Sequence, residues 1–281
     1  MLPLRKPAWL KKKIEFNSSR ETSVLLKTIG VNTVCKEAKC PNLSECFKNS
    51  HASFLILGRS CTRACAFCNV DKGKPEKPDP QEPKRIAEAV AKLRLRHVVI
   101  TSVTRDDLPD GGAKAFSDTT RSIERTTSVE LLIPDLKGDE KALACVIDSS
   151  PAILGHNIET VPRLYHLRPG ASYARSLFIL KMAKKINKNI FTKSALMLGL
   201  SENEGEVLNI MEDLRSVNCD FLALGQYLRP SLKACEVAEY ILPETFDRYK
   251  KTGLDMGFKH IEAGPFVRSS YHAIDYFSTG I

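Results

Sequence analysis

Six short apolar runs recur along this sequence of 281 residues and restrict its fold more than any other feature. Runs of about four to eight apolar residues are typical of strands that are buried on both faces of a parallel sheet. The sequence therefore predicts six buried strands, at residues 53–57, 97–101, 129–133, 151–155, 193–199 and 220–225.

Helical patterns lie between most of these runs. In residues 83–95, apolar side chains recur at helical spacing behind Pro83, which suits the first turn of a helix. Residues 173–186 and 204–217 have the same pattern, and residues 243–258 are helix-like. Strands that alternate with helices predict an α/β fold with right-handed crossovers, either a doubly wound open sheet or a partial barrel.

Polar loops follow the predicted strands. In both architectures the carboxyl ends of the strands meet at one face, where ligands bind. Polar loops begin near residues 61, 101, 156, 201 and 226, so we expect them to form one shared site.

Two segments stand outside this alternation. Residues 1–52 form a basic N-terminal extension with little periodicity, and residues 259–281 form a C-terminal segment. The sequence has no internal repeat, low-complexity tract or linker long enough to separate domains. The simplest organisation is one catalytic domain at residues 53–258 with these two appendages.

The cellular compartment follows from hydropathy. The sequence has no run of eighteen apolar residues, and its first sixteen residues are too polar for a signal peptide or a membrane span. We therefore expect a soluble, cytoplasmic protein that does not contact membranes. Because the cytosol keeps thiols reduced, its nine cysteines are expected to bind metal rather than to form disulfides.

Six of the nine cysteines fall in two groups of three, and the single Cys145, Cys219 and Cys235 are predicted to be small buried hydrophobes. Structural zinc usually takes four ligands from paired motifs, which neither group supplies. Three thiolates can instead hold three irons of a 4Fe–4S cluster and leave the fourth iron open. A zinc site completed by His51 remains the alternative. The two groups are Cys35, Cys40 and Cys46, then Cys61, Cys65 and Cys68.

The second group, with Phe67 just before its last cysteine, resembles the signature of the radical S-adenosylmethionine (SAM) superfamily. More narrowly, the chain resembles the lipoyl synthase family over about residues 30–275. This resemblance implies a partial (β/α)6 barrel. The matching stretches are CKEAKCPNLSECF, ASFLILGRSCTRACAFCNV, TSVTRDDLPDGGA, HNIETVPRLY, RPGASYARSL, GQYLRPS and GPFVRSSYHA.

The resemblance implies that Cys61, Cys65 and Cys68 hold a 4Fe–4S cluster whose open iron binds SAM. Reductive cleavage of SAM then gives a 5′-deoxyadenosyl radical that removes hydrogen from an aliphatic carbon. The protein positions the cofactor. The residues expected at the cofactor are Phe67, Thr101, Ser102, Asn157, Glu159, Gln226 and Tyr227, although each polar one is also explained by ordinary loop capping.

The resemblance also implies a second 4Fe–4S cluster on Cys35, Cys40 and Cys46. Its fourth ligand is a serine of the RSSY stretch, Ser269 or Ser270, with Ser269 preferred. A serine oxygen is a weak ligand beside soft thiolates, so it can be displaced. In the family this auxiliary cluster donates sulfur to carbons six and eight of an octanoyl chain on a carrier lysine. Two SAM molecules are spent for each lipoyl group.

The partners expected from the resemblance are octanoylated lipoyl carrier domains, namely 2-oxoacid dehydrogenase acyltransferase subunits and the glycine cleavage H protein. An electron donor and an iron–sulfur carrier are expected as well. A formal net charge of +9 suits acidic carriers. Nucleic acid is the usual rival partner of a basic chain, but Lys and Arg are widely spread and no RNA- or DNA-binding motif is present.

The sequence departs from the family pattern at three places: Gly155, where the family has asparagine, Ala195, where it has glycine, and GLSE in place of GLGE. We interpret these as changes to the pocket wall, because all seven expected ligands are present. Two other classes of function stay open. One is a related radical enzyme with another aliphatic substrate, and the other is a non-catalytic iron or zinc protein on the same scaffold.

Overall fold

The computed structural model describes residues 5–12, 20–49, 51–274 and 276. The chain divides into two compact units. The β2 unit comprises Lys13–Ala64 and Asn69–Leu154, and the β9 unit comprises Met1–Lys12, Cys65–Cys68 and Gly155–Ile281. Each unit is described by itself. β7 (Ile153–Gly155) is the strand at which the chain passes from the one unit to the other.

The strands of the β2 unit are mainly parallel. β2 (Ser53–Ile56) pairs in parallel with β5 (His97–Ser102), and β5 pairs in parallel with β6 (Ser128–Leu132). β1 (Asn32–Thr33) pairs with β2 in the antiparallel direction. β3 (Ser60–Cys61) forms a separate parallel pair with β4 (Asp71–Lys72).

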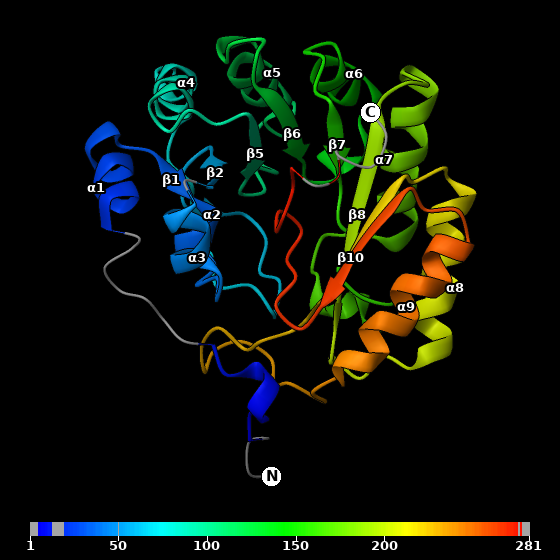
Figure 1. Cartoon of the computed structure of the whole chain (residues 1–281). Helices are drawn as coiled ribbons and strands as arrows, with labels where there is room; N and C mark the ends of the chain where they lie inside the picture. The colour runs from blue at the N-terminus through cyan, green and yellow to red at the C-terminus, as the bar shows by residue number, and fades with distance from the viewer. Residues whose placement is uncertain (1–4, 13–19, 50, 275, 277–281) are drawn as a thin grey trace. The chain divides into compact units, whose positions relative to one another are not determined.

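The helices of the β2 unit form where the sequence has an apolar stripe. In α4 (Glu82–Lys92), Ile86, Ala89 and Val90 are buried while Glu88 between them is exposed. In Figure 1, α4, α5 and α6 follow one another beside β5 and β6. The other helical segments are α1 (Arg20–Ile29), α2 (Val34–Glu37), α3 (Leu43–Lys48), α5 (Ala113–Ser122), η2 (Leu136–Gly138) and α6 (Glu140–Ile147).

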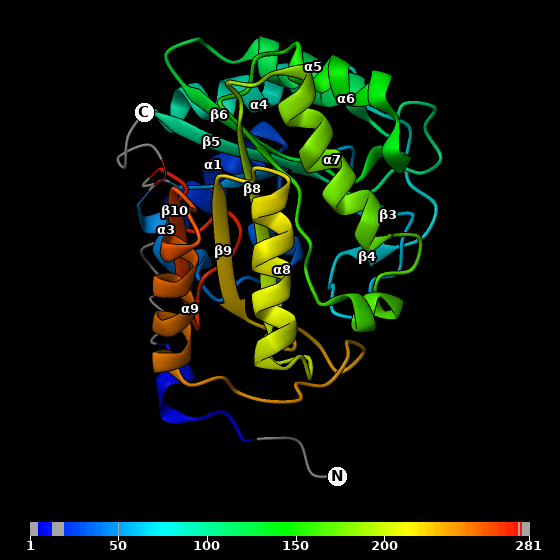
Figure 2. The same ribbon diagram turned by 90° about the vertical axis from the view of Figure 1, so that its right-hand side faces the viewer.

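The β9 unit has three long parallel strands. β9 (Phe221–Gln226) lies between β8 (Phe191–Leu198) and β10 (His260–Gly264). Figure 2 shows α8 and α9 running along these strands. The helices are η1 (Ala8–Leu10), η3 (Pro162–Leu167), α7 (Tyr173–Ile186), α8 (Glu204–Ser216) and α9 (Pro243–Asp255).

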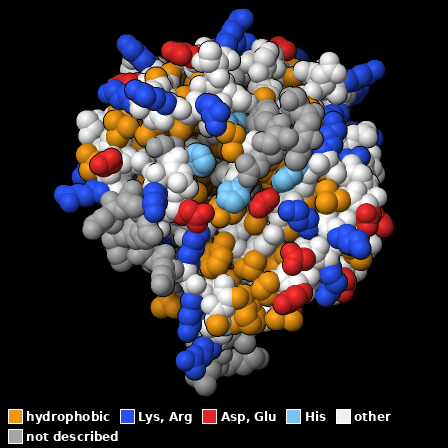
Figure 3. Space-filling view, viewed as in Figure 1, with side chains coloured by type: hydrophobic (Ala, Val, Ile, Leu, Met, Phe, Trp, Pro, Cys, Tyr) orange, Lys and Arg blue, Asp and Glu red, His pale blue; other side chains and the backbone are white. Residues whose placement is uncertain are grey.

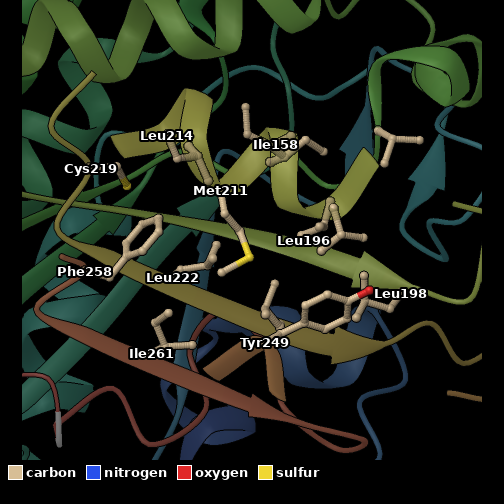
Figure 4. Packing of buried hydrophobic residues seen from close by; sticks show 14 of the residues in the cluster. Ile158, Leu196, Leu198, Met211, Leu214, Cys219, Leu222, Tyr249, Phe258 and Ile261 are labelled. Carbon is tan, nitrogen blue, oxygen red and sulfur yellow. The ribbon is translucent and has the colours of Figure 1, made fainter. Parts of the chain in front are cut away.

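The core of the β9 unit lies between these helices and the strands. Met211 of α8 is fully buried in one hydrophobic cluster with Leu196 of β8 and Leu222 of β9. Phe258 and Ile261 belong to the same cluster (Figure 4). Burying a side chain of this size contributes about 1.5–3 kcal/mol to folding. This packing fixes the strand ends from which the polar loops leave.

The six predicted strands are all present, as β2, β5, β6, β7, β8 and β9. β10 continues the parallel sheet beyond the six, and β1, β3 and β4 are two-residue strands too short for a periodic signal. The predicted division into an extension, a catalytic domain and a C-terminal segment stays a prediction. Residues 1–4, 13–19 and 50 of the predicted extension, and residues 275 and 277–281 of the C-terminal segment, lie outside the described residues.

Among the helices that the structure describes, none combines the length and the apolar character needed to cross a lipid bilayer. Of the three single cysteines, Cys219 is buried as predicted, and Cys145 and Cys235 are half-buried.

Candidate active site

The loop after β2 holds Cys61 by its sulfur. Two backbone amides donate to Cys61 Sγ, that of Arg63 at 3.4 Å and that of Thr104 at 3.3 Å. Thr62 fastens the same loop, because its backbone N–H and its Oγ1 both donate to the Thr104 carbonyl, at 3.1 and 2.9 Å. Amide donors favour the negatively charged form of a thiolate. The position of Cys61 Sγ is therefore fixed by two backbone amides, one from its own loop and one from the loop after β5.

Arg63, two residues after Cys61, lies between two carboxylates. Its guanidinium donates to Asp106 at 2.7 and 2.9 Å and to Asp135 at 2.7 and 3.0 Å. Burial lowers the pKa of Arg63, but Asp106 and Asp135 outweigh that effect and hold it above its ordinary value. Removal of one partner from such a buried pair costs about 3–5 kcal/mol.

Leu57, the residue directly after β2, is fixed on both sides. Glu82 Oε2 accepts a hydrogen bond from the Leu57 N–H at 2.7 Å, and Arg105 donates to the Leu57 carbonyl at 3.3 Å. Arg105 is in turn held by Asp107 through two hydrogen bonds of 2.9 and 2.8 Å. Burial raises the pKa of Glu82, although the Leu57 N–H and Arg85 act in the opposite direction. Charged side chains thus fix the start of the cysteine loop.

Cys65 and Cys68 belong to the β9 unit. A turn joins them, in which the Cys68 N–H donates to the Cys65 carbonyl at 3.2 Å. The residue between them, Ala66, donates to the Leu167 carbonyl at 2.8 Å and accepts from the Cys235 N–H at 2.9 Å. Phe67 packs against the hydrophobic core of the same unit. Its ring therefore contributes to the position of this turn.

Thr101 and Ser102 end β5, as predicted, but their hydroxyl groups differ. Thr101 Oγ1 donates to the Leu132 carbonyl of β6 at 2.9 Å, so its hydrogen is engaged within the sheet. Ser102 Oγ is buried, and no described residue is its hydrogen-bond partner. A buried hydroxyl without a partner is costly, and a bound polar ligand removes that cost.

Asn157 connects two of the predicted site residues. Its Nδ2 donates to Glu159 Oε1 at 2.9 Å, and its Oδ1 accepts from Ser269 Oγ at 3.0 Å. Burial raises the pKa of Glu159, and Arg168 and Asn157 partly oppose that rise. Glu159 adopts a left-handed backbone conformation with φ 68°. This conformation is rare for residues other than glycine and is typical of functional sites.

The segment that contains Ser269 passes very close to β9. A Cβ atom on Gly225 would lie 2.1 Å from the Val267 carbonyl oxygen, so only glycine permits this approach. Val267 packs on Ala195 and Ala223, with Tyr271 against the same cluster. The structure thus brings Ser269 to Asn157 by packing the residues before it on the strands.

Gln226, which ends β9, and Tyr227, which follows it, are engaged by backbone groups. Gln226 Nε2 donates to three carbonyl oxygens, and its Oε1 accepts from the Ile241 N–H at 2.8 Å. Tyr227 Oη donates to the Cys235 carbonyl at 2.8 Å. Nearly all polar atoms of these two side chains are used by backbone groups, and only the second lone pair of Gln226 Oε1 could accept from a ligand. Gln226 and Tyr227 therefore act mainly by holding the loops after β8 and β9.

The first cysteine group lies on two short helices and the turn between them. Cys35 is buried on α2, and its carbonyl accepts from the Cys40 N–H at 3.0 Å. The Cys46 N–H donates to the Asn42 carbonyl in α3 at 2.9 Å. Burial raises the pKa of Cys35 to about 11, and the neighbouring Cys40 thiol adds to the rise.

Both cysteine groups fit iron–sulfur clusters in their chemistry. None of the nine cysteines forms a disulfide with a described residue, and two backbone amides donate to Cys61 Sγ. Within the described residues, no three His, Cys, Asp or Glu side chains stand together as a ready metal site.

Sequence reasoning assigned no role to Arg63, Asp106 or Asp135, although two of them lie in quoted stretches. The sequence does contain a signal for them, because Arg63 lies between two expected cluster ligands and an acidic pair follows a predicted strand.

Two of the positions that depart from the family pattern can be described. Ala195 is buried against Val267 of the C-terminal segment, and Ser201 has φ 85°, a conformation that favours glycine. Glu202 still caps that turn, accepting from the Gly199 and Leu200 N–H groups at 2.5 and 2.8 Å.

Comparison with solved structures shows the fold. Methylornithine synthase (PylB) has a TM-score of 0.54 and 14% identity, over 83% of this chain and 67% of that one. SuiB of Streptococcus suis bound to S-adenosylmethionine has a TM-score of 0.58 and 12% identity, over 76% of this chain and 50% of that one. The model of the Radical SAM superfamily matches residues 55–214. The α/β fold predicted for that superfamily is confirmed.

Comparison with curated proteins decides the narrower family. Lipoyl synthase of Geobacter sulfurreducens is 56% identical, over 97% of this chain and 91% of that protein. Lipoyl synthase of Citrifermentans bemidjiense is 54% identical, over 99% and 97%. The chain belongs to the lipoyl synthase family. The resemblance and the enzyme class predicted from the motifs are therefore confirmed, and membership of the radical SAM superfamily implies a 4Fe–4S cluster and SAM.

Proposed function

We propose that this enzyme inserts two sulfur atoms, at carbons six and eight, into an octanoyl chain on a carrier lysine and so forms the lipoyl group. The observation behind this proposal is the combination of two groups of three cysteines with a serine-containing tail, in a member of the lipoyl synthase family. A radical enzyme without a sulfur donor needs only one such group.

In this proposal Cys61, Cys65 and Cys68 hold the cluster that cleaves SAM. When bound, that cluster supplies the electron that breaks a carbon–sulfur bond of SAM and gives the 5′-deoxyadenosyl radical. The amides of Arg63 and Thr104 stabilise the thiolate of Cys61, and Phe67 fixes the turn between the other two ligands. These residues position the cluster ligands.

The polar residues at the strand ends are proposed to bind SAM. Ser102 has a buried hydroxyl that needs a partner, and Thr101 beside it keeps acceptor lone pairs. Glu159, oriented by Asn157, is proposed to accept hydrogen bonds from ribose hydroxyls. We propose that Gln226 and Tyr227 act mainly by holding the loops that border the cofactor.

The auxiliary cluster on Cys35, Cys40 and Cys46 is proposed to be the sulfur-donating substrate, with one SAM spent for each insertion. Ser269 is preferred over Ser270 as its fourth ligand. Ser269 donates its hydrogen to Asn157, and this leaves its oxygen lone pairs free for iron. A serine oxygen is a hard ligand beside soft thiolates. Its bond to iron would therefore be the one that breaks when the cluster is attacked.

The proposed substrates are octanoylated lipoyl domains of 2-oxoacid dehydrogenase acyltransferases and the H protein, with a separate electron donor and an iron–sulfur carrier. The basic net charge favours acidic carriers. On the face seen in Figure 3, Lys and Arg side chains are spread among acidic ones rather than gathered into a nucleic-acid patch. Cysteines that form no disulfide with a described residue suit the reducing cytoplasm, which is the proposed compartment.

The test is anaerobic reconstitution with iron and sulfide, followed by SAM, a reductant and an octanoyl-lysine peptide. Mass spectrometry should show two sulfurs in place of two hydrogens, together with 5′-deoxyadenosine. Formation of 5′-deoxyadenosine without a change in the mass of the peptide would show that the proposed substrate is wrong. Zinc with no acid-labile sulfide would overturn the radical chemistry.

A further inference from the structure

Apart from the Thr104 amide, the stretch Thr104–Asp107 has no part in the function proposed so far, yet its polar groups contact the loop that contains Cys61. The Thr104 amide donates to Cys61 Sγ at 3.3 Å, and the Asp106 amide donates to Thr62 Oγ1 at 3.1 Å. Asp106 also accepts two hydrogen bonds from Arg63. Three successive residues of one loop, 61–63, are thus bound by a second loop more than forty positions away.

Arg63 adds a third loop to this arrangement. Its guanidinium reaches Asp135, which follows β6 and also accepts from the Lys137 N–H at 3.2 Å. Lys137 Nζ returns to the Asp106 carbonyl at 2.7 Å, so the loops after β5 and β6 are joined as well. The side chains of Arg63 and Asp135 are 8% and 2% exposed. Water therefore competes little with the two charge-assisted hydrogen bonds to Asp135, whereas the Asp106 side chain is 29% exposed.

An exposed ion pair on the surface provides a contrast, because it does not join distant loops. The pair of Lys114 with Asp118 on α5 is exposed and lies within one helix, at the i,i+4 spacing. The bonds of Arg63, by contrast, join residues 43 and 72 positions apart and hold a backbone amide against a ligand sulfur. The geometry fits the positioning of Cys61 better than it fits stability alone.

We propose that Arg63, Asp106 and Asp135 form a clamp that keeps two amide donors on Cys61 Sγ and thereby sets the reduction potential of the cluster bound there. This inference rests on the proposed role of Cys61. Hydrogen bonds to a cluster sulfur stabilise the more negative, reduced state and raise the potential. A loosened clamp lowers the potential and weakens the binding of iron.

The decisive variant is Arg63→Lys. Lysine keeps the positive charge, but a single ammonium group lacks the fork that bridges two carboxylates. We expect a lower midpoint potential of the reconstituted cluster in a redox titration followed by EPR, and iron binding weakened by about 10- to 100-fold. In the metal-free protein, amide hydrogen exchange at residues 61–64 and 104–106 should become faster, while overall circular dichroism stays the same.

Two further variants complete the test. Asp118→Asn breaks the exposed pair on α5 and should leave the potential, the iron content and the exchange rates unchanged. Thr62→Val removes the hydroxyl between the Thr104 carbonyl and the Asp106 amide, and it should lower the potential in the same direction even if Arg63→Lys does not fold.

The outcomes separate two kinds of failure. If Cys61→Ala keeps the wild-type EPR signal of the SAM-cleaving cluster, the proposed function of Cys61 is wrong. If Cys61→Ala loses that signal but Arg63→Lys, or Thr62→Val in its place, matches the wild type in potential, iron binding and exchange, the clamp does not position Cys61 and the inference is overturned.

Discussion

The two cysteine groups differ in what holds their ligands, although Cys61 and the whole Cys35 group lie in the same unit. Around Cys61 the bonds are long-range and charged, and they join residues up to 72 positions apart. Around Cys35, Cys40 and Cys46 the backbone bonds described are local, such as Cys40 N–H to the Cys35 carbonyl. The Cys61 site is thus fixed largely by charged contacts between loops. The Cys35 site is fixed by helix and turn geometry together with neutral hydrogen bonds of Ser53 with Cys35 and of Asn69 with the Glu37 carbonyl.

This difference matches the two proposed roles. A cluster that must survive many turnovers gains from a rigid environment, because reorganisation of its ligands would shift its potential. A cluster that gives up its sulfur has to come apart and be rebuilt, and short local helices permit this without disturbing the strands. The comparison thus makes separate predictions for each region.

The largest expected effect separates the two cysteine groups. Cys61→Ala removes a ligand of the proposed SAM-cleaving cluster, so 5′-deoxyadenosine formation should fall by more than about 100-fold, beyond the effect of losing an outer partner. Cys40→Ala should keep deoxyadenosine formation and stop sulfur insertion. Chromatography of deoxyadenosine and mass spectrometry of the peptide measure the two. If both well-folded variants lost SAM cleavage equally, the proposal that the two cysteine groups have separate roles would be wrong.

A matched glycine pair tests the rigidity of the Cys61 region. Gly112 has φ 94°, and a Cβ there would lie 2.4 Å from Leu57 Cδ1, directly before the cysteine loop. Gly112→Ala should cost about 2–4 kcal/mol from backbone strain and overpacking. Gly30 has φ 76° but its nearest contact is 3.8 Å away, so Gly30→Ala should cost only about 1 kcal/mol. Denaturant unfolding of both compares them, and equal costs would contradict the contrast.

A smaller effect is expected where α1 contacts the helix of Cys46. Thr22 Oγ1 donates to the Phe47 carbonyl at 2.8 Å in a buried site. Thr22→Val should therefore lower the free energy of unfolding by about 1–2 kcal/mol. Thr33 Oγ1, just before α2, is buried without a partner, so Thr33→Val should be neutral or slightly stabilising. Comparable losses in both variants would show that the Thr22 hydrogen bond is not the cause.

The smallest effect is a pH dependence at Glu82. Burial raises its pKa in the folded protein, so folding takes up a proton above the ordinary carboxyl range of about 4.3. The contribution of Glu82 to stability is therefore greatest at low pH and falls as the pH rises through the raised pKa. Glu82→Gln should remove this fall. Unfolding free energies of both proteins from pH 5 to 7 provide the measurement, and parallel curves would disprove it.

Much of the fold was predictable because it depends on local patterns. The six apolar runs became β2 and β5–β9, since a buried strand needs only a short stretch of apolar residues to be recognised. β10 was only a short apolar run, and β1, β3 and β4 have two residues each, so their pairing depends on the neighbouring strands. The cysteine groups were equally readable, because ligand spacing is a property of the sequence.

The remainder of the site required the folded chain. The partners of Arg63 lie 43 and 72 positions away, and nothing in their local sequence joins them. Gln226 ends a strand as expected, but its amide is engaged by four backbone groups from three segments. The close approach of Gly225 to Val267, which leads Ser269 toward Asn157, is likewise a tertiary contact.

The sequence by itself determined the family, the strands and the thiols available to metal, because periodicity and spacing act over a few residues. Only the tertiary structure decided which charged side chain holds which loop and which hydroxyl is left without a partner. The physical reason is that ion pairs and buried hydrogen bonds depend on distances between groups that the chain brings together only when its core packs.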